Sequence, residues 1–263
     1  MPRVIAITGG SAGIGHATAI RLARDGAAVA VCARRHEKLE TAAADVVTAG
    51  GQALAVVADV ASEADMARFV DATVNRFGRL DVMICNAGFG VAGAIDDITT
   101  DQMRKLVDVN YMGTFYAARA ALAVFRKQQA GHLIVISSIV GKRGVPYMGA
   151  YSATKFAQVG MAECLRAEVA GSPIHVSVVY PVSTESEFFD VMSRETGTSV
   201  TRAFGPRQEA SVVADAIARA IDRPVPEVYP HATSRALVWL NAIAPGYTDR
   251  IVRRFGRKPV ESR

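Results

Sequence analysis

The stretch Val4-Ile-Ala-Ile-Thr-Gly-Gly-Ser-Ala-Gly-Ile-Gly15 decides the fold of this 263-residue chain. It opens with a short apolar run rich in β-branched residues, which is typical of a buried strand. Glycines interrupt the run, and an amphipathic helical pattern then extends from about residue 13 to residue 25. Glycines at such a turn let the backbone approach a diphosphate, which a helix amino terminus favours. The spacing of Gly9, Gly13 and Gly15 differs from the common GxGxxG fingerprint, so the position of the turn between strand and helix is what favours a nucleotide site.

The same alternation of strand and helix continues along the chain. Strands are predicted at about 3–8, 28–33, 52–57, 80–85, 131–137, 174–180 and 226–229. Helices are predicted at about 13–25, 36–50, 63–77, 100–129, 150–170 and 208–222. Regular alternation with nearly continuous apolar strands indicates a parallel sheet covered by helices on both faces. The prediction is one α/β domain over residues 1–263, a doubly wound, Rossmann-like and mostly parallel sheet of about seven strands.

Two regions depart from this alternation. Residues 181–207 are polar and irregular, yet they contain apolar side chains of the kind that close a lid over an apolar site. These side chains are Phe188, Phe189, Met192 and Phe204. Residues 231–255 are expected to form an extra helical segment, interrupted at Pro245-Gly246, that serves as an additional packing element.

Composition excludes several classes of protein. Half of the residues are hydrophobic, and the chain is long enough to bury a substantial core. The longest apolar runs, such as 27–33, fall well short of a membrane span, so no transmembrane helix is expected. Met1-Pro-Arg3 leads directly into the first strand without a signal segment, which predicts a cytoplasmic protein. Cys32, Cys85 and Cys164 have neither disulfide nor metal-ligand spacing, and all three are expected to pack in the core.

The net charge of +5 gathers largely at the carboxyl end of the chain. The basic residues there are Arg250, Arg253, Arg254, Arg257, Lys258 and Arg263. Such a tail is either a solvated terminus or a contact for a polyanion or an anionic substrate tail. Aromatic residues are too sparse and scattered to form a base-stacking surface, and no nucleic-acid partner is expected.

Polar residues follow the predicted strands at the edge where open α/β sheets collect their ligands. Asp59-Val60 ends the third strand, Asn86-Ala-Gly88 the fourth and Ser137-Ser138 the fifth. Small residues at 87 and 88 would let a flat ring or a ribose lie against the backbone. A serine hydroxyl at the fifth strand is a turn residue or a hydrogen-bond donor to a substrate oxygen.

Arg34-Arg35 follows the second strand, where enzymes that prefer NAD usually carry a carboxylate. Arginines at this place either begin an exposed helix or bind a 2′-phosphate by donating charge-assisted hydrogen bonds to it. The second alternative predicts NADP(H) as the cofactor.

Tyr151 and Lys155 lie four residues apart in a predicted helix, so both side chains emerge from one face. A free tyrosine titrates near ~10 and is a poor acid–base catalyst at neutral pH. A fixed ammonium beside the phenol stabilises its phenolate. A tyrosine and a lysine at this spacing, taken alone, are more often a half-buried ring beside a solvated charge. The glycine-rich turn, Asn86–Gly88 and Ser138 are what make a catalytic pair the better interpretation.

These residues together resemble the short-chain dehydrogenase/reductase family in its single-domain form, over roughly residues 3–230. Thr8–Gly15 is similar to the family's TGxxxGxG motif, Asn86–Gly88 to its NAG motif and Tyr151–Lys155 to its YxxxK motif. Asn110 with Gly113 resembles the structural asparagine motif of the family.

The resemblance implies roles for four residues. Tyr151 would be the general acid–base, Ser138 would polarise the carbonyl or hydroxyl, and Lys155 would lower the pKa of the tyrosine while holding the nicotinamide ribose. Asn110 would kink its helix and hold a water in a proton relay from Lys155 to solvent. The residues expected to bind the cofactor are Gly9, Ser11, Gly13, Ile14, Gly15, Arg34, Arg35, Asp59, Val60, Asn86, Ala87, Gly88, Tyr151, Lys155, Pro181, Val182, Ser183, Thr184 and Ser186.

One departure from the family pattern follows the sixth strand. The family usually has Pro-Gly there, whereas this chain has Pro181-Val182, and Ser186 stands where a threonine often contacts the carboxamide. The bulkier Val182 is expected to narrow the pocket or shift the lid, which would affect the choice of substrate more than the type of reaction.

The leading hypothesis is an NADP(H)-dependent oxidoreductase that moves hydride between nicotinamide and a carbonyl or secondary-alcohol carbon. One alternative is a non-catalytic NADP(H)-binding regulatory protein, although such family members usually lack part of the four-residue set that is complete here. The other alternative, an epimerase or dehydratase of nucleotide sugars, needs a larger substrate domain than the residues after Lys155 provide.

Apolar residues in loops near the active edge favour a lipid-like, steroid-like, aromatic or acyl carbonyl substrate over a free sugar. The apolar residues are Phe89, Val91, Val145, Tyr147, Met148, Phe188, Phe189 and Met192. The predicted substrate-binding set is Ser138, Tyr151, Val145, Tyr147, Phe188 and Phe189.

The helical segments 100–129 and 150–170 carry alanine-rich faces larger than one sheet face can bury. The alanines include Ala117, Ala118, Ala120, Ala121, Ala157 and Ala162. The family pairs these two helices across a dimer interface, so a homodimer or homotetramer is predicted.

Overall fold

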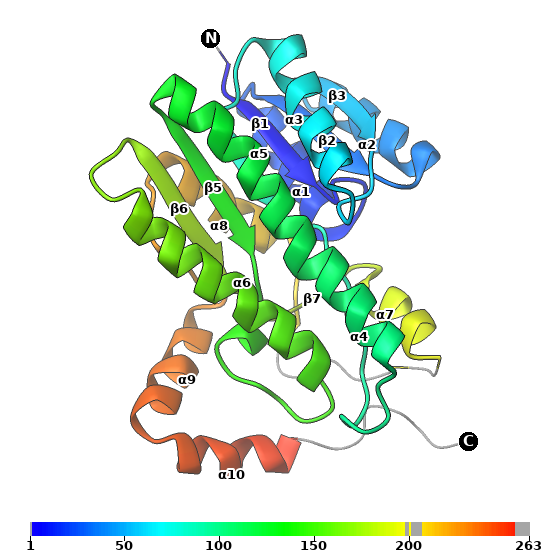
Figure 1. Ribbon diagram of the computed structural model, residues 1–263, viewed down its shortest axis with the longest axis vertical. Helices are drawn as coiled ribbons and strands as arrows, with labels where there is room; N and C mark the ends of the chain where they lie inside the picture. The colour runs from blue at the N-terminus through cyan, green and yellow to red at the C-terminus, as the bar shows by residue number, and fades with distance from the viewer. Residues whose placement is uncertain (1, 198–199, 201–206, 256–263) are drawn as a thin grey trace.

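The computed structural model describes residues 2–197, 200 and 207–255, and within these ranges seven parallel strands form one sheet (Figure 1). Their order across the sheet is β3-β2-β1-β4-β5-β6-β9. The strands are β1 (Val4–Thr8), β2 (Ala28–Ala33), β3 (Gln52–Val57), β4 (Val82–Cys85), β5 (Gly131–Ile136), β6 (Ile174–Val179) and β9 (Glu227–Val228). The predicted doubly wound α/β fold is therefore confirmed, although the strands predicted at 80–85 and 226–229 are shorter than expected.

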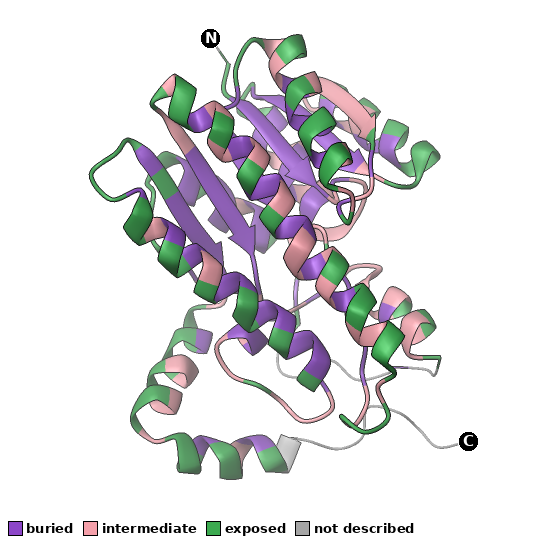
Figure 2. Cartoon of the chain, in the orientation of Figure 1, coloured by how far each residue is buried: buried purple, intermediate pink, exposed green. Residues whose placement is uncertain are grey.

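Helices cover both faces of the sheet (Figure 1). One face carries α1 (Gly13–Arg24), α2 (His36–Thr48) and α8 (Ala210–Asp222), and the other carries α3 (Glu63–Phe77), α5 (Gly113–Gln128) and α6 (Gly149–Glu168). Successive strand residues point to opposite faces, so Ile5 and Ile7 join one buried cluster while Ala6 joins the other. Most strand residues are buried, whereas those of the edge strand β3 are intermediate or exposed, and the outer sides of the helices are exposed, as Figure 2 shows.

Local signals place the helix ends close to where the sequence predicts them. Ser62 caps α3 by accepting a hydrogen bond from the backbone N–H of Asp65 at 3.2 Å. Gly78 ends the same helix with a φ of 82°, a conformation that glycine adopts without strain.

The helix predicted at 100–129 is not one α-helix. It consists of α4 (Thr100–Leu106), a π-helical turn (Val107–Met112) and α5. Asn110 lies in the π turn and is fully buried. A local change of helix type at this residue agrees with the expectation that Asn110 would distort its helix.

The lid region contains structure that the sequence pattern did not predict. Its helix α7 (Phe188–Thr196) is preceded by the short strand β7 (Ser183–Thr184), which pairs with β8 (Arg207–Gln208). Phe204, which we assigned to the lid, lies outside the described residues. The extra segment forms α9 (Ala232–Ile243) and α10 (Pro245–Phe255), and Pro245 begins the second of these helices.

Two predictions about packing are wrong in part. Cys32 and Cys85 are buried, but Cys164 is exposed, because the period of α6 places it opposite the face that carries Ala162 and Leu165. Four of the alanines assigned to a partner interface lie in the protomer's own core. They are Ala117, Ala118, Ala121 and Ala162. None of the helices in the described ranges is long and apolar enough to cross a membrane.

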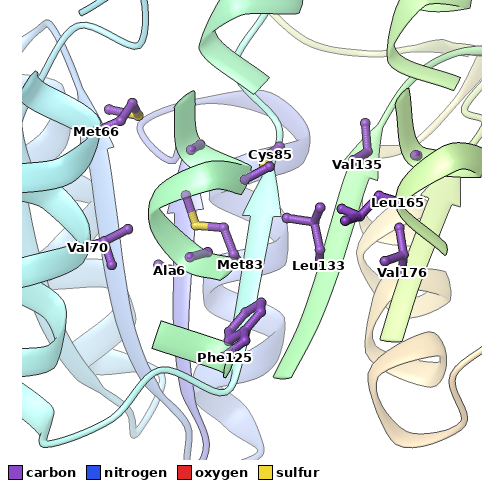
Figure 3. Packing of buried hydrophobic residues seen from close by; sticks show 14 of the residues in the cluster. Ala6, Met66, Val70, Met83, Cys85, Phe125, Leu133, Val135, Leu165 and Val176 are labelled. Carbon is purple, nitrogen blue, oxygen red and sulfur yellow. The ribbon is translucent and has the colours of Figure 1, made fainter. Parts of the chain in front are cut away.

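The core between the sheet and α5 is tightly filled around Phe125, which is labelled in Figure 3. Gly131 begins β5 beside this ring, and a Cβ atom at residue 131 would lie 2.1 Å from Phe125 Cγ. Close-packed interiors resist added volume, so Gly131→Ala should lower the free energy of unfolding by about 1–3 kcal/mol. Denaturation in urea measures this loss.

Gly160→Ala is the matched control for that substitution. Gly160 lies within α6, and a Cβ atom there would meet nothing within 4 Å. Alanine favours helix more than glycine, so this variant should be as stable as the wild type or more stable by up to about 1 kcal/mol. Equal stabilities of the two variants would contradict the packing described for Phe125.

Candidate active site

A cleft of about 470 Å³ opens at the carboxyl ends of the strands. The loops after β1 to β6 and the lid form its wall, so segments far apart in the sequence meet at one edge of the sheet. Open α/β sheets bind ligands at this edge.

The glycine-rich turn has the shape of a diphosphate cradle. Gly9 and Gly13 have φ angles of 65° and 55°, and a Cβ atom at Gly15 would lie 2.4 Å from the Gly9 carbonyl oxygen. The residue before α1, Ala12, supplies no side-chain cap to the first N–H groups of that helix. These N–H groups and the close backbone fit a diphosphate, which supports a dinucleotide at this site.

Asn86 holds the loops after β1 and β4 together. Its side-chain Nδ2 donates to the carbonyl oxygens of Thr8 at 2.9 Å and Gly9 at 3.1 Å. The Thr8 hydroxyl in turn accepts from the backbone N–H groups of Asn86 and Ala87 at 3.0 and 3.1 Å. This reciprocal set fixes the glycine-rich turn relative to the floor of the cleft.

Asn110 fixes the next part of the floor from beneath. Its Oδ1 accepts from the N–H of Phe89 at 3.0 Å, and its Nδ2 donates to the Phe89 carbonyl oxygen at 2.9 Å and to Thr154 Oγ1 at 3.0 Å. A Cβ atom at Gly88 would lie 3.0 Å from Asn110 Oδ1, so only a very small residue fits there. Asn110 lies behind the wall of the cleft and positions it.

Tyr151, Lys155 and Ser138 all line the cleft. Lys155 Nζ lies 5.7 Å from the centre of the Tyr151 ring. Burial raises the pKa of Tyr151 above its ordinary value, and a hydrogen bond with the Ser138 side chain opposes this shift. Burial also lowers the pKa of Lys155 to about 7. Both shifts disfavour the charged forms, the phenolate of Tyr151 and the ammonium of Lys155. The groups that keep Lys155 charged therefore decide how well it can stabilise the phenolate.

Two acceptors hold Lys155. Its Nζ donates to the Ile136 carbonyl oxygen at 2.8 Å and to Gln158 Oε1 at 3.0 Å. Our sequence analysis missed Gln158, which is fully buried one turn further along α6. Its spacing of three residues from Lys155, on the same helical face, is the signal that could have identified it.

The far end of the cleft is basic. Arg34 is exposed, lines the cleft and makes no hydrogen bond or ion pair with another described residue. Arg35 and Lys38 both bind Glu187, which directly precedes α7, and the Arg35–Glu187 distance is 2.9 Å. Lys38 and Arg35 hold the pKa of the Glu187 carboxyl below its usual value. Sequence reasoning missed Lys38 and Glu187 because they come from separate elements.

The lid lies over the apolar part of the cleft, beside α4 (Figure 1). The ring centres of Phe188 and Tyr151 are 5.5 Å apart. Glu195 ties α7 to α4 through an ion pair with Lys105 at 2.6 Å, and its carbonyl oxygen accepts from Gln102 Nε2 at 2.8 Å. These contacts place apolar side chains directly next to the catalytic tyrosine candidate.

Most of the predicted site residues line the cleft. They are Gly9, Ser11, Gly13, Ile14, Arg34, Arg35, Asp59, Val60, Asn86, Ala87, Gly88, Ser138, Tyr151, Lys155, Pro181, Val182, Ser183, Thr184, Ser186, Phe188 and Phe189. Gly15, Asn110, Val145 and Tyr147 lie outside this wall. Val145 packs instead against the buried cluster around Met148, so it is a supporting residue.

Comparison with known proteins gives a consistent result. The family model described as short chain dehydrogenase matches residues 3–196. An uncharacterized oxidoreductase of Listeria innocua is 34% identical over 223 residues, which cover 82% of this chain and 90% of that protein. Among solved structures, an alcohol dehydrogenase from Thermococcus sibiricus in complex with 5-hydroxy-NADP is 26% identical with a TM-score of 0.77, covering 87% of this chain and 96% of that chain.

A short-chain dehydrogenase/reductase from Burkholderia phymatum, solved in complex with NAD, shares the fold with a TM-score of 0.85. It is 22% identical and covers 100% of this chain and 98% of its own. Similar proteins have thus been solved with both kinds of nicotinamide cofactor.

Proposed function

This chain belongs to the short-chain dehydrogenase family and is an NAD(P)-dependent oxidoreductase of CH–OH and C=O groups, and we propose that it prefers NADP(H) and a mainly apolar substrate. The observation that carries the proposal is one cleft that joins an arginine unpaired among the described residues, a phosphate cradle, a tyrosine–lysine pair and an apolar lid. The cytoplasmic location expected from the sequence stays a prediction.

The proposed mechanism assigns proton transfer to Tyr151. In the reducing direction its phenol donates a proton to the carbonyl oxygen, and Ser138 donates a hydrogen bond to the same oxygen. Lys155 stabilises the phenolate that remains. When bound, the nicotinamide ring supplies or accepts the hydride. The first turn of α1 would hold the diphosphate, and Lys155 the nicotinamide ribose.

The preference for NADP(H) rests on Arg34. A guanidinium binds phosphate through paired, charge-assisted hydrogen bonds, and Arg34 is exposed at the cleft without a carboxylate partner in the described part of the chain. Arg35 and Lys38 share the single carboxylate of Glu187, so a 2′-phosphate would compete with that carboxylate for them. Arg34 is therefore the first contact that we propose for the phosphate.

The apolar character of the proposed substrate rests on the side chains around Tyr151. The buried cluster that includes Tyr151 contains Phe89, Val140, Met148 and Met192, and Phe188 packs against it from the lid. Apolar walls with a few convergent polar groups favour a lipid-like, steroid-like, aromatic or acyl ketone or the matching secondary alcohol. Val182 also lines the cleft, which supports the idea that it narrows the pocket.

Tyr151→Phe should reduce turnover by about 10²–10⁴-fold because the proton donor is lost, while cofactor binding stays measurable. NADPH absorbance measures this with steroid, long-chain and aromatic ketones and with sugars. Tyr147→Phe is the matched control, since Tyr147 lies outside the wall of the cleft and should keep wild-type rates.

The same assay separates the alternatives. Near-wild-type rates for Tyr151→Phe would refute the mechanism, and activity confined to polyols would refute the apolar substrate. A wild-type protein that binds NADPH yet oxidises none of it with any ketone would favour the non-catalytic regulatory protein.

Arg34→Ala should abolish the preference for NADP(H) over NAD(H). A charge-assisted hydrogen bond contributes about 1.5–3 kcal/mol, so the wild type should bind NADP(H) at least about tenfold more tightly, and less so as salt rises. Glu187→Gln should change the preference in the opposite direction because it frees Arg35 and Lys38. Titration of both cofactors into the three proteins measures this, and equal affinities in the wild type would disprove the assignment.

We also propose a dimer through the outer faces of α5 and α6, where Phe115 and Phe156 are 38% and 44% exposed. Large exposed apolar side chains on neighbouring helices favour association. Light scattering at micromolar concentration should give a dimer or tetramer mass, and the double variant Phe115→Glu/Phe156→Glu should be monomeric. Val212→Glu, at a 41% exposed position on α8, should leave the mass unchanged. A monomeric wild type would reject the proposal.

A further inference from the structure

The side chain of Gln158 joins Lys155 to the backbone of Asn110. Its Oε1 accepts from Lys155 Nζ at 3.0 Å. Its Nε2 donates to the Asn110 carbonyl oxygen and to Thr114 Oγ1, both at 2.7 Å. Gln158 is fully buried, so no solvent competes for these contacts.

The neighbours of Gln158 allow only one orientation of its amide. An ammonium only donates hydrogen bonds, so the amide oxygen must face Lys155. The Thr114 hydroxyl donates to the Asn110 carbonyl oxygen at 2.7 Å, which leaves its lone pairs to accept from Gln158 Nε2. A reversed amide would place N–H groups against the ammonium and oxygen against a carbonyl. The amide is therefore held as an acceptor for Lys155.

The carbonyl of Asn110 is saturated by the same network. A carbonyl oxygen has two lone pairs, and here it accepts from Gln158 Nε2 and from Thr114 Oγ1. A water that linked Lys155 to this carbonyl would have to displace Gln158 Nε2 or Thr114 Oγ1, because these two donors use both lone pairs. A carboxamide neither takes up nor releases a proton near neutral pH, so it cannot replace such a water in a relay.

We propose that Gln158 is a positioning residue that holds the Lys155 side chain charged and aimed at Tyr151, and that it closes the proton route through Asn110. The proton that Tyr151 donates is then replaced from the substrate cleft. This inference rests on the proposed function for its catalytic consequence, whereas the hold on Lys155 is a property of the protein alone.

The surroundings of Lys155 support the proposal. Tyr151 faces it from the preceding turn of α6, the Ile136 carbonyl from β5, and uncharged Asn110 and Thr114 lie behind Gln158. Burial alone lowers the pKa of Lys155, with no contribution from a charged side chain among the described residues. The two acceptors are thus what opposes the loss of its proton.

The test is the titration of Lys155 followed by NMR of the full chain labelled at lysine, with Lys155→Met to assign the signal. Gln158→Met removes the acceptor at similar volume, so the ammonium should lose its proton about one pH unit lower. Gln158→Glu keeps an acceptor oxygen and adds charge, so the midpoint should stay or rise. Gln128→Met is the control, because Gln128 bonds Leu80 far from the cleft.

Turnover gives an independent readout. Loss of the ammonium makes the phenolate of Tyr151 harder to form, so the rising limb of the pH profile for alcohol oxidation should move to higher pH in Gln158→Met. The KM for the alcohol should not change. If Gln158 had only a structural role, the pH profiles of Gln158→Met and Gln158→Glu would shift in the same direction.

An unchanged Lys155 midpoint in Gln158→Met, or equal shifts in both variants, would overturn the proposal. If Gln158→Met does not fold, Gln158→Glu decides alone, and a Lys155 midpoint that falls in this variant would overturn the proposal. A wild type that is inactive on every alcohol would refute the proposed function but leave the NMR titration decisive for Gln158.

Discussion

A lysine buried beside a tyrosine at the end of the central strands is the constraint on which the site depends. Transfer of an ammonium from water into a protein interior is unfavourable unless acceptors replace the lost water. Lys155 meets this requirement with a backbone carbonyl from β5 and the amide of Gln158 on its own helix. Gln158 in turn needs the carbonyl of Asn110, and Asn110 needs the loop after β4. The charged centre and the floor of the cleft are therefore one hydrogen-bonded unit.

Motifs that act through the local backbone could be predicted from the sequence. The glycine-rich turn and the pair Tyr151–Lys155 depend on spacing within one or two elements, and the strand–helix alternation depends on local periodicity. Residues whose meaning comes from a remote partner could not. The spacing of Gln158 from Lys155 indicates only a shared helical face, whereas its bond to the carbonyl of Asn110 needs the fold, and Glu187 becomes informative only where the residues after β2 meet the lid. The prediction for Cys164 was wrong for a different reason, because it followed the apolar neighbours along the chain and not the helical period, which places Cys164 opposite Ala162 and Leu165.

The lid and the basic end of the cleft share one carboxylate. Glu187 precedes α7, whose Phe188 lies against Tyr151, and its single carboxylate binds both Arg35 and Lys38. An anion that competes for these two cations also releases one restraint on the lid. By thermodynamic linkage, a lid position that withdraws Glu187 must strengthen the binding of that anion to the same extent. The cations Arg35 and Lys38 and the first residue before the lid helix are therefore linked through one carboxylate.

The π turn at Val107–Met112 changes how a single stripe of side chains is used. In an uninterrupted α-helix, residues 103, 106, 117 and 121 would face one direction, since their spacing follows the period of 3.6. The wider turn contains about one extra residue and so rotates all that follows by roughly 100°. Met103 and Leu106 accordingly join the cluster around Tyr151, while Ala117 and Ala121 join the core beneath the sheet. The turn therefore directs the apolar residues before it and after it to two different clusters. One continuous stretch of chain thus contributes both to the stability of the domain and to the shape of its pocket.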